Sequence, residues 1–342
     1  MTPMRIAVRV DLFAWLIPAL AFGQSNFAAA VKSGEGLPRL HSLLASRHGE
    51  VILEHYFRGT RATSFENVKS ASKSVISALV GIAIERKLLP GVDAPIAPYF
   101  PELSAANGDP AKRKITIEDL LTMRSGLVDT NRGYGAWVRS PNWVRYLLTR
   151  PLQQPPGGPM DYNTGNTHLL SAILTKVSGS DTWTFAQNTL AAPLGITLAK
   201  WPRDPQGVYF GGNDMLLTPR QMLKFGELYL HRGRSGDRQI VPASWVEASW
   251  TPRTRSLRSG HQYGYGWWIT EFGGHTVEFA WGFGGQYIFI VPSLDLVVVT
   301  TSSIALGDDR REYRQELFDI VEKDVIGEIQ KRSLTNRPVT TG

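Results

Sequence analysis

The chain has 342 residues, of which 42% are hydrophobic and 10% aromatic, so it can bury a large core and is not expected to be disordered. It has no cysteine, which excludes disulfides, thiolate metal sites and a cysteine nucleophile. The formal charge is +7, but the basic residues are scattered, with the densest cluster at 112–114, so nucleic acid is not an expected partner. The 7 histidines show no metal-ligand spacing, so neither a metal nor another cofactor is expected.

The first 23 residues predict a secretory signal peptide. Two arginines precede the apolar run 12–22, and the small residues Ala21 and Gly23 provide a cleavage site. Because this run is too short for a comfortable membrane span, we expect cleavage after Gly23, export to the periplasm or the medium, and no stable membrane anchor afterwards. Asp11, between the basic and apolar parts, keeps an uncleaved anchor or a mis-assigned start as alternatives.

Strand patterns occur towards both ends of the remaining chain. After a segment with little expected structure up to about Gly36, residues 42–46 and 51–57 predict two strands joined by a turn. Four further strands are predicted at 266–269, 276–280, 286–291 and 294–301. An amphipathic helix is expected over 310–329, followed by a disordered tail after Ser333.

The stretch between these strands is predicted to be mainly helical. Helical periodicity and capping signals cover residues 70–87, 116–124, 142–148, 168–177, 182–190, 219–230 and 244–249. This order implies an α+β fold, in which an antiparallel sheet built from both termini is flanked by helices and a helical lobe is inserted. We expect one domain over 24–342, with a sheet lobe at about 37–66 and 262–330 and a helical lobe at about 67–261.

The stretch Lys69-Ser70-Ala71-Ser72-Lys73 places a hydroxyl and an amine three residues apart where an apolar helix begins. Residues three apart share a helix face, so Ser70 and Lys73 would be neighbours. A buried lysine loses its preference for the proton, and the neutral amine can then take the proton of a serine. The helix amino end also offers free N–H groups to a developing anion. The alternative is that Ser70 is only a helix N-cap.

Ser70-Ala71-Ser72-Lys73 matches the Ser-x-x-Lys element of β-lactamases and penicillin-binding proteins. With this element and the segment 115–127, the mature chain resembles the serine hydrolases related to class C β-lactamases and penicillin-binding proteins. That family also holds esterases, D-amino-acid peptidases and nylon-oligomer hydrolases. The resemblance implies a β-lactamase-like fold, a structural role for 115–127, and Ser70 as nucleophile with Lys73 as its activating partner.

The resemblance also implies a tyrosine that shuttles the proton. Tyr162 fits the family's Tyr-x-Asn element, because it follows a loop rich in proline and glycine and precedes a helix. The third residue is Thr164 instead of asparagine, and an amide occurs at Asn166, so both are candidates for the missing group. A phenol beside the ammonium of Lys73 is expected to have a lowered pKa and to act as a phenolate base. The alternative is a partly buried tyrosine with a satisfied hydroxyl.

The best match to the family's third element, Lys-Thr-Gly or His-x-Gly, is the segment 280–286. It resembles the Trp-Gly-Gly and Gly-x-Gly-Gly variants of the esterase and nylon-hydrolase branches. Gly282 would let the backbone approach the substrate, and the N–H of Phe283 would pair with that of Ser70 to hold an oxyanion. The alternative is that these glycines only form a strand turn.

Ala280 stands where the family has a cation that binds a substrate carboxylate, and Trp281 offers only an aromatic face. This difference disfavours efficient β-lactamase activity. Arg310 and Arg311 are alternative cations, although a solvated helix face is their simpler interpretation. For the segment 211–214, a turn is favoured over a role in a substrate pocket.

These observations predict an exported serine hydrolase that cleaves a small-molecule ester or small amide through an acyl-enzyme on Ser70, with Lys73 and Tyr162 transferring protons. A β-lactamase or D-amino-acid peptidase of the same family is the first alternative. A catalytically weak penicillin-binding or sensor protein on the same scaffold is the alternative from another class.

Overall fold

The computed structural model describes residues 27–104, 109–305, 307 and 309–335. The predicted signal peptide over 1–23 lies outside the described residues, as does the predicted tail from residue 336 onwards. Among the helices of the described part, none is long and apolar enough to cross a membrane.

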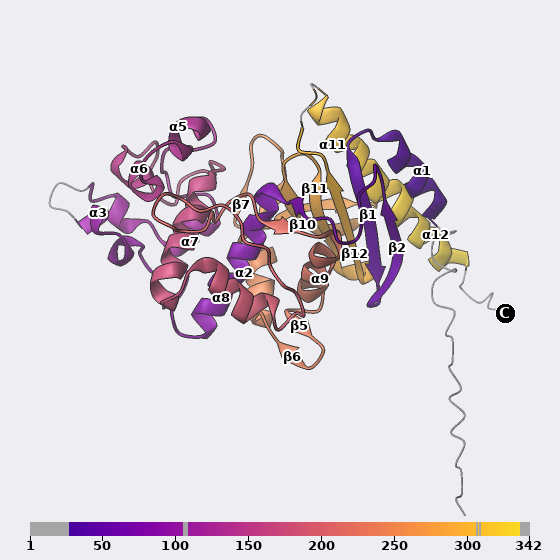
Figure 1. The fold of residues 1–342 in the computed structure, drawn as a ribbon, viewed down its shortest axis with the longest axis horizontal. Helices are drawn as coiled ribbons and strands as arrows, with labels where there is room; N and C mark the ends of the chain where they lie inside the picture. Colours follow the sequence, from indigo (N-terminus) through magenta and orange to yellow (C-terminus); the bar gives the residue numbers. More distant parts are fainter. Residues whose placement is uncertain (1–26, 105–108, 306, 308, 336–342) are drawn as a thin grey trace, which may run out of the picture.

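An eight-stranded antiparallel sheet forms one half of the molecule, with the strand order β2-β1-β12-β11-β10-β9-β8-β7 (Figure 1). Its strands are β1 (Leu40–Arg47), β2 (Glu50–Tyr56), β7 (Thr254–Arg255), β8 (Gln262–Tyr263), β9 (Trp268–Phe272), β10 (His275–Gly282), β11 (Gln286–Val291) and β12 (Leu296–Ser302). Leu43 of β1 lies opposite Thr300 of β12, so strands from the two ends of the chain pair with each other inside the sheet. The predicted α+β fold with a sheet built from both termini is confirmed.

The central strands β11 and β12 are buried along their whole length because helices cover both faces of the sheet. Successive side chains of a strand point to opposite faces. Ile288 and Val297 therefore join the core shared with the middle of the chain, whereas Phe289 and Val298 join the core beneath the terminal helices. This two-sided burial explains why each strand contains a continuous apolar run, at 287–291 and 296–299.

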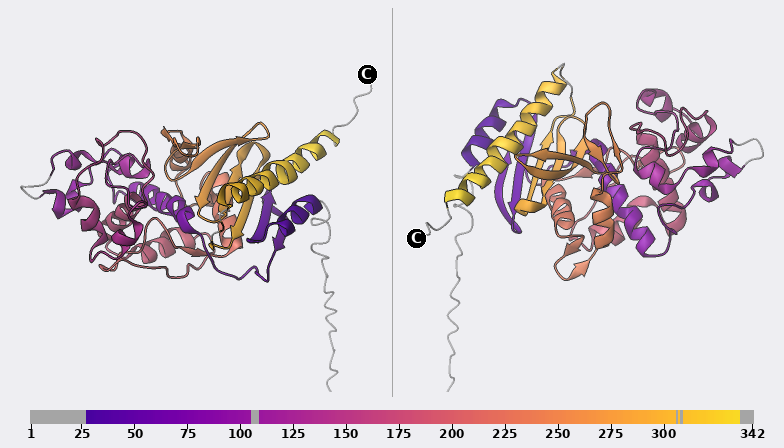
Figure 2. Two further views of the ribbon diagram at one scale, coloured as in Figure 1. Left: turned by 90° about the horizontal axis from the view of Figure 1, so that it is seen from above. Right: turned by 180° about the vertical axis from the view of Figure 1, so that it is seen from behind.

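The outer face of the sheet is covered by helices from both ends of the chain (Figure 2). They are α1 (Ala28–Gly36), α11 (Arg310–Asp319), a π-helical segment (Ile320–Ile326) and α12 (Gly327–Thr335). The expectation of little structure up to Gly36 is wrong for α1. Its sequence has a weak helical pattern, but Ala30 is fully buried in the outer core, and most helical stability comes from such packing.

The inner face is covered by helices from the middle of the chain. α9 (Pro219–Leu230) packs on β11 and β12, and α10 (Ala243–Trp250) packs on α2 (Ser72–Glu85). Gly226 of α9 allows this close approach, since a Cβ there would lie 2.5 Å from Val297. α2 is almost wholly buried and runs between the sheet and the remaining helices (Figure 1). Those are α3 (Pro101–Ser104), α4 (Ile117–Leu121), α5 (Tyr134–Val138), α6 (Trp143–Thr149), α7 (Thr164–Ser178) and α8 (Thr182–Ala186).

Two small antiparallel pairs complete the fold. They are β3 (Glu66–Asn67) with β4 (Leu216–Leu217), and β5 (Arg234–Ser235) with β6 (Arg238–Gln239). The β3–β4 pair joins the segment that precedes α2 to the segment that precedes α9. It therefore fixes two loops, distant in sequence, beside the amino end of α2.

Candidate active site

Ser70 lies in a short 3-10 turn, η2 (Lys69–Ala71), that leads directly into α2. Lys73 follows in the first turn of α2, so the two side chains share one face, as their spacing predicts. The Nζ of Lys73 lies 2.9 Å from the Oγ of Ser70. Ser70 is half-buried, whereas Lys73 is only 1% exposed, so the structure brings a reachable hydroxyl against a buried amine.

Among the described residues, the amine of Lys73 has three hydrogen-bond partners, none of them a carboxylate. It donates to the carbonyl oxygen of Gly212 at 2.6 Å, to Ser70 at 2.9 Å and to the Oγ1 of Thr164 at 3.3 Å. Burial lowers the pKa of Lys73 to about 7, and the negative charge of Asp214 partly opposes this effect. A large fraction of the amine is therefore neutral near pH 7 and can accept a proton.

Tyr162 lies beside Lys73, but the amine faces its ring instead of its oxygen. The Nζ is 5.0 Å from the ring centroid. The ring also packs against Trp268 at 5.4 Å and Tyr263 at 6.3 Å between centroids. Burial raises the pKa of Tyr162 well above its ordinary value, and a hydrogen bond with Ser70 offsets only part of this rise. The expectation of a lowered pKa is wrong, and the phenol is neutral where Lys73 titrates.

Thr164 and Asn166, both candidates for the missing family asparagine, have different surroundings. The Oγ1 of Thr164 accepts a hydrogen bond from Lys73 and donates to the Oδ1 of Asn131 at 2.7 Å. Asn166 is fully buried, and its Oδ1 accepts a hydrogen bond from Ser125 at 2.8 Å. Thr164 thus contacts the reactive pair, whereas Asn166 ties α7 to the segment 115–127.

The position of Thr164 follows from the start of α7. This helix begins four residues before the predicted start, because Asn163 caps it by accepting a hydrogen bond from the N–H of Gly165 at 3.0 Å. Thr130 fixes the cap by donating to the same oxygen of Asn163 at 2.7 Å. Sequence reasoning missed Asn131, since nothing in the segment around it signals a role.

The segment 211–214, predicted as a turn, is also part of the site. A Cβ on Gly212 would lie 2.4 Å from the Oγ1 of Thr167, and one on Gly211 would lie 2.1 Å from the carbonyl oxygen of Thr167. The paired glycines therefore let this loop lie against the first turns of α7. That approach brings the Gly212 carbonyl to Lys73, a role that the adjacent glycines could have indicated.

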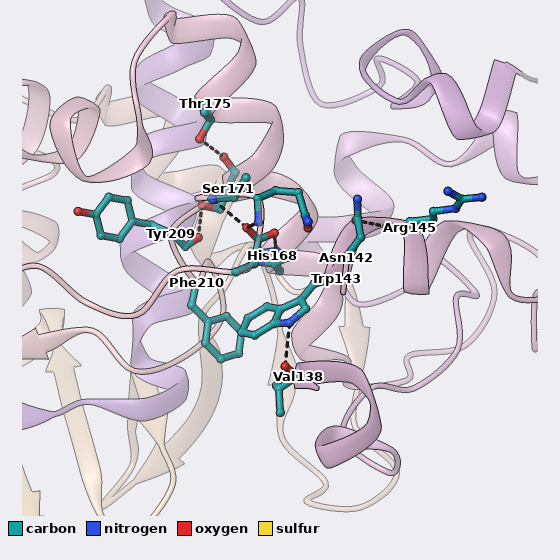
Figure 3. Close-up of polar contacts among 12 residues, drawn as sticks. Val138, Asn142, Trp143, Arg145, His168, Ser171, Thr175, Tyr209 and Phe210 are labelled. Carbon is teal, nitrogen blue, oxygen red and sulfur yellow. Dashed lines mark hydrogen bonds and ion pairs between the residues drawn. The ribbon is translucent and has the colours of Figure 1, made fainter. Parts of the chain in front are cut away.

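Buried contacts with α7 and α6 hold the stretch that leads into this loop (Figure 3). Ser171 donates a hydrogen bond to the carbonyl oxygen of Tyr209 at 2.6 Å. The Nε2 of His168 lies 3.0 Å from the Oδ2 of Asp204, and both side chains are fully buried. The ring of Phe210 packs against Trp143 at 5.0 Å between centroids, so this tryptophan belongs to the core of the helical region.

The end of β10 lies against the segment that carries Ser70. A Cβ on Gly282 would lie 2.2 Å from the carbonyl oxygen of Val68, two residues before the serine. Only glycine therefore allows the strand to come this close. Phe283, which follows in the β10–β11 turn, has a side chain that is partly exposed to solvent.

Trp281 points to the opposite face of the sheet from Gly282 and faces the terminal helix. The guanidinium of Arg314 lies 5.3 Å from the centroid of its ring, and Trp268 lies 5.3 Å away between centroids. A cavity of about 510 Å³ opens here beside Phe283, and its walls include Trp281, Arg310, Arg311 and Arg314. The two arginines named as alternative cations thus lie next to the β10–β11 turn.

No group of histidine, aspartate and glutamate side chains in the described part of the chain is arranged to hold a metal ion. The functional groups brought together are instead a serine hydroxyl, a lysine amine, a phenol and a threonine hydroxyl. Their contacts suit acyl transfer by a serine nucleophile with an adjacent base.

Comparison with known proteins identifies relatives along most of the chain. The β-lactamase family model matches residues 41–321. The 6-aminohexanoate-dimer hydrolase of Paenarthrobacter ureafaciens is 23% identical over 336 residues, which is 90% of this chain and 81% of that protein.

Solved structures show the same fold. The hydrolase EstCE1, described as having promiscuous acyltransferase activity, superposes with a TM-score of 0.70 at 18% identity, covering 87% of this chain and 99% of that one. The octameric penicillin-binding protein homologue from Pyrococcus abyssi gives a TM-score of 0.70 at 18% identity, covering 89% and 77%.

Proposed function

Because the chain belongs to the β-lactamase family of hydrolases, we propose that it cleaves an ester or small amide through an acyl-enzyme on Ser70. The observation that carries this proposal is the 2.9 Å contact between the Oγ of Ser70 and the buried amine of Lys73. An adjacent base is what activates a serine hydroxyl as a nucleophile.

In the acylation step, the Oγ of Ser70 attacks the substrate carbonyl carbon while its proton passes to the neutral amine of Lys73. The resulting tetrahedral intermediate collapses when the bond to the leaving group breaks. The leaving alkoxide or amine takes the proton from the ammonium of Lys73, directly or relayed through the phenol of Tyr162, so the amine becomes neutral again. A water molecule then gives a proton to this amine as it attacks the acyl carbon, the bond from that carbon to Oγ breaks, and the ammonium returns the proton to the Oγ of Ser70.

The negative charge on the carbonyl oxygen needs hydrogen-bond donors in the transition state. We assign the backbone N–H groups of Ser70 and Phe283 to this task. The N–H of Ser70 belongs to the first helical turn, where such groups have no partner within the helix. Gly282 supports the assignment, since its close approach to Val68 brings the β10–β11 turn towards Ser70.

The expected substrate is a neutral ester or small amide. Ala280, which stands where the family has a cation, is fully buried and offers no group to a carboxylate. The likeness to a 6-aminohexanoate-dimer hydrolase supports cleavage of an amide, and the likeness to EstCE1 supports a hydrolase.

A second candidate function is hydrolysis of a β-lactam or of a peptide that ends in a D-amino acid. Both substrates carry a carboxylate, and Arg310 and Arg311 line the cavity beside Phe283. Arginine binds carboxylates well because its guanidinium can donate two parallel hydrogen bonds. Comparison of the turnover of nitrocefin, a nitrophenyl ester and a linear amide by the same preparation separates these functions.

Substitution of Ser70 tests the assignment directly. Ser70→Ala should abolish hydrolysis of a short-chain nitrophenyl ester, and its circular dichroism spectrum and melting temperature should match those of the wild type. Intact mass after incubation with a fluorophosphonate should show one adduct on the wild type and none on the variant. Retained hydrolysis would refute the assignment, and a wild type without adduct or turnover would favour the non-catalytic binding or sensor protein.

We also propose export, which rests on the sequence of residues 1–23 alone. Expression of the full chain in a bacterium should yield a periplasmic protein whose first residue is Gln24. A protein that keeps its leader and stays with the membrane fraction would contradict cleavage.

A further inference from the structure

An ion pair joins the residue before the nucleophile to the loop that holds the base. The Nζ of Lys69 lies 2.7 Å from the Oδ1 of Asp214, and both side chains are about one-fifth exposed, at 20% and 19%. Lys69 directly precedes Ser70, and Asp214 stands two residues after Gly212, whose carbonyl accepts the hydrogen bond from Lys73. The pair therefore spans the two segments between which the reactive groups lie.

The backbones of both partners adopt the left-handed conformation, with φ of +49° at Lys69 and +64° at Asp214. Residues with a Cβ rarely adopt this conformation, and they keep it only where the surroundings impose it. Lys69 and Asp214 both have this left-handed conformation, and they contact each other beside the reactive groups. This coincidence indicates that the ion pair imposes the local backbone geometry.

Asn67 completes this arrangement. Its Oδ1 accepts a hydrogen bond from the backbone N–H of Lys69 at 3.0 Å, and its Nδ2 donates to the Oδ1 of Asp214 at 2.8 Å. Asn67 lies in β3, which pairs with β4 immediately beyond the loop that carries Asp214. One side chain thus fixes the backbone of Lys69 and orients the carboxylate of Asp214.

We propose that Lys69 and Asp214 are positioning residues, which clamp the Ser70 segment onto the Gly212 loop and hold a single carboxylate near Lys73. This inference rests on the proposed function. Neither side chain is assigned a contact with the reacting atoms. Lys69 acts through Ser70, which directly follows it, and Asp214 acts through Gly212, two residues before it.

The charged and titratable groups around this clamp decide whether each partner raises or lowers the pKa of Lys73. Lys73 is faced by the phenol of Tyr162, and the charge of Asp214 favours its protonated form. Asp214 is faced by Lys69, and its charge also contributes to raising the pKa of Tyr134. Removal of the carboxylate should therefore lower the pKa of Lys73, whereas removal of Lys69 should raise it.

The test is the pH dependence of kcat/KM for a nitrophenyl ester. Asp214→Asn should move the acid limb to lower pH by about one unit, the low end of the effect of an opposite charge. Lys69→Gln should move it to higher pH. Both variants should reduce the plateau about tenfold, and the double variant should lose little more than either single one, because the two changes break the same contact.

Arg220→Gln is the matched control, since it breaks an ion pair with Glu54, 2.6 Å long, that links α9 to β2 outside the site. It should leave the acid limb and the plateau unchanged. Should Asp214→Asn not fold, Lys69→Gln and the conservative Asp214→Glu carry the test, and Asp214→Glu should restore most of the plateau. Acid limbs that stay in place or move in the same direction in the two single variants would overturn the proposal.

Labelling of Ser70 by a fluorophosphonate separates this outcome from failure of the proposed function. A wild type that neither reacts nor hydrolyses the ester would refute the proposed function itself. A wild type that reacts, together with Lys69→Gln and Asp214→Asn variants that react at the wild-type rate at every pH, would refute the clamp alone.

Discussion

Lys73 donates its shortest hydrogen bond, 2.6 Å, to the carbonyl oxygen of Gly212, and within the described part of the chain it donates none to a carboxylate. A carbonyl dipole stabilises an ammonium less than a full negative charge does, so burial dominates and lowers the pKa to about 7. The pKa of the amine therefore lies near neutral pH, and a general base is most effective when its pKa is close to the pH of the reaction. Burial, opposed in part by the charge of Asp214, thus sets how much of the base is available.

The first prediction concerns the pH dependence set by Lys73. Below pH 7, kcat/KM should fall about tenfold per pH unit, because only the neutral amine can take the proton of Ser70. Lys73→Arg keeps a charge that is not lost at any accessible pH, so activity should fall at least about 100-fold over the whole range. Steady-state kinetics with a nitrophenyl ester between pH 5 and about pH 9 measure both effects, and an active Lys73→Arg with an unchanged profile would contradict the assignment of the base.

Tyr162→Phe separates a neutral phenol from a phenolate base. Burial raises the pKa of Tyr162, so the phenol keeps its proton throughout the neutral range and acts only as a donor. The variant should lose about 100-fold in kcat/KM, while its acid limb stays near pH 7, where Lys73 titrates. Loss or displacement of that limb in the variant would instead identify Tyr162 as the base.

Residue spacing predicted the parts of this site that depend on one local segment. Ser70 and Lys73 are three residues apart, and the helix alone makes them neighbours. Gly212 reaches the same amine from a segment far away in the chain, and Asn131 acts on it only through Thr164. A backbone carbonyl also leaves no trace in the residue types. The pKa of Tyr162 was predicted in the wrong direction because its burial depends on residues such as Trp268, about 100 positions later.

The fold shows the same division between local and long-range information. The hairpin of β1 and β2 and the strand β11 follow from alternating or continuous apolar runs, and both were predicted. α1 was not predicted, because its only strong stabilisation comes from the outer face of the sheet. The start of α7 was placed too late because Asn163, a residue type favoured at the helix N-cap, was assigned to the preceding loop.

Thr164 and Asn166 should respond differently to substitution. Thr164→Val removes the hydroxyl that links Lys73 to Asn131, and one hydrogen bond is worth about 1 kcal/mol, so kcat/KM should fall about fivefold with little change in stability. Asn166→Ala removes the acceptor for the hydroxyl proton of Ser125 in the interior, which should cost about 1–3 kcal/mol in the free energy of unfolding.

Urea unfolding and kinetics per mole of folded enzyme check both variants. The folded fraction of Asn166→Ala should keep most of its activity, because Asn166 has no contact with Lys73 among the described residues. The reverse pattern, with an inactive Asn166→Ala and a fully active Thr164→Val, would show that Asn166 replaces the family asparagine.

Glu278 should make the stability of the protein depend on pH. It lies on β10 with 7% of its surface exposed, and its Oε2 has no hydrogen-bond partner within the described part of the chain. Burial raises the pKa of Glu278 to about 7, so between its ordinary value of 4.5 and pH 7 the folded protein binds more protons than the unfolded chain. The contribution of this group to stability is therefore present below pH 4.5 and is lost as the pH rises through 7.

Glu278→Gln should flatten this part of the profile of stability against pH. It should also raise the melting temperature at pH 8 relative to the wild type, measured by calorimetry at several pH values. A variant that melts below the wild type at pH 8 would show that the ionised carboxylate is stabilised by a partner.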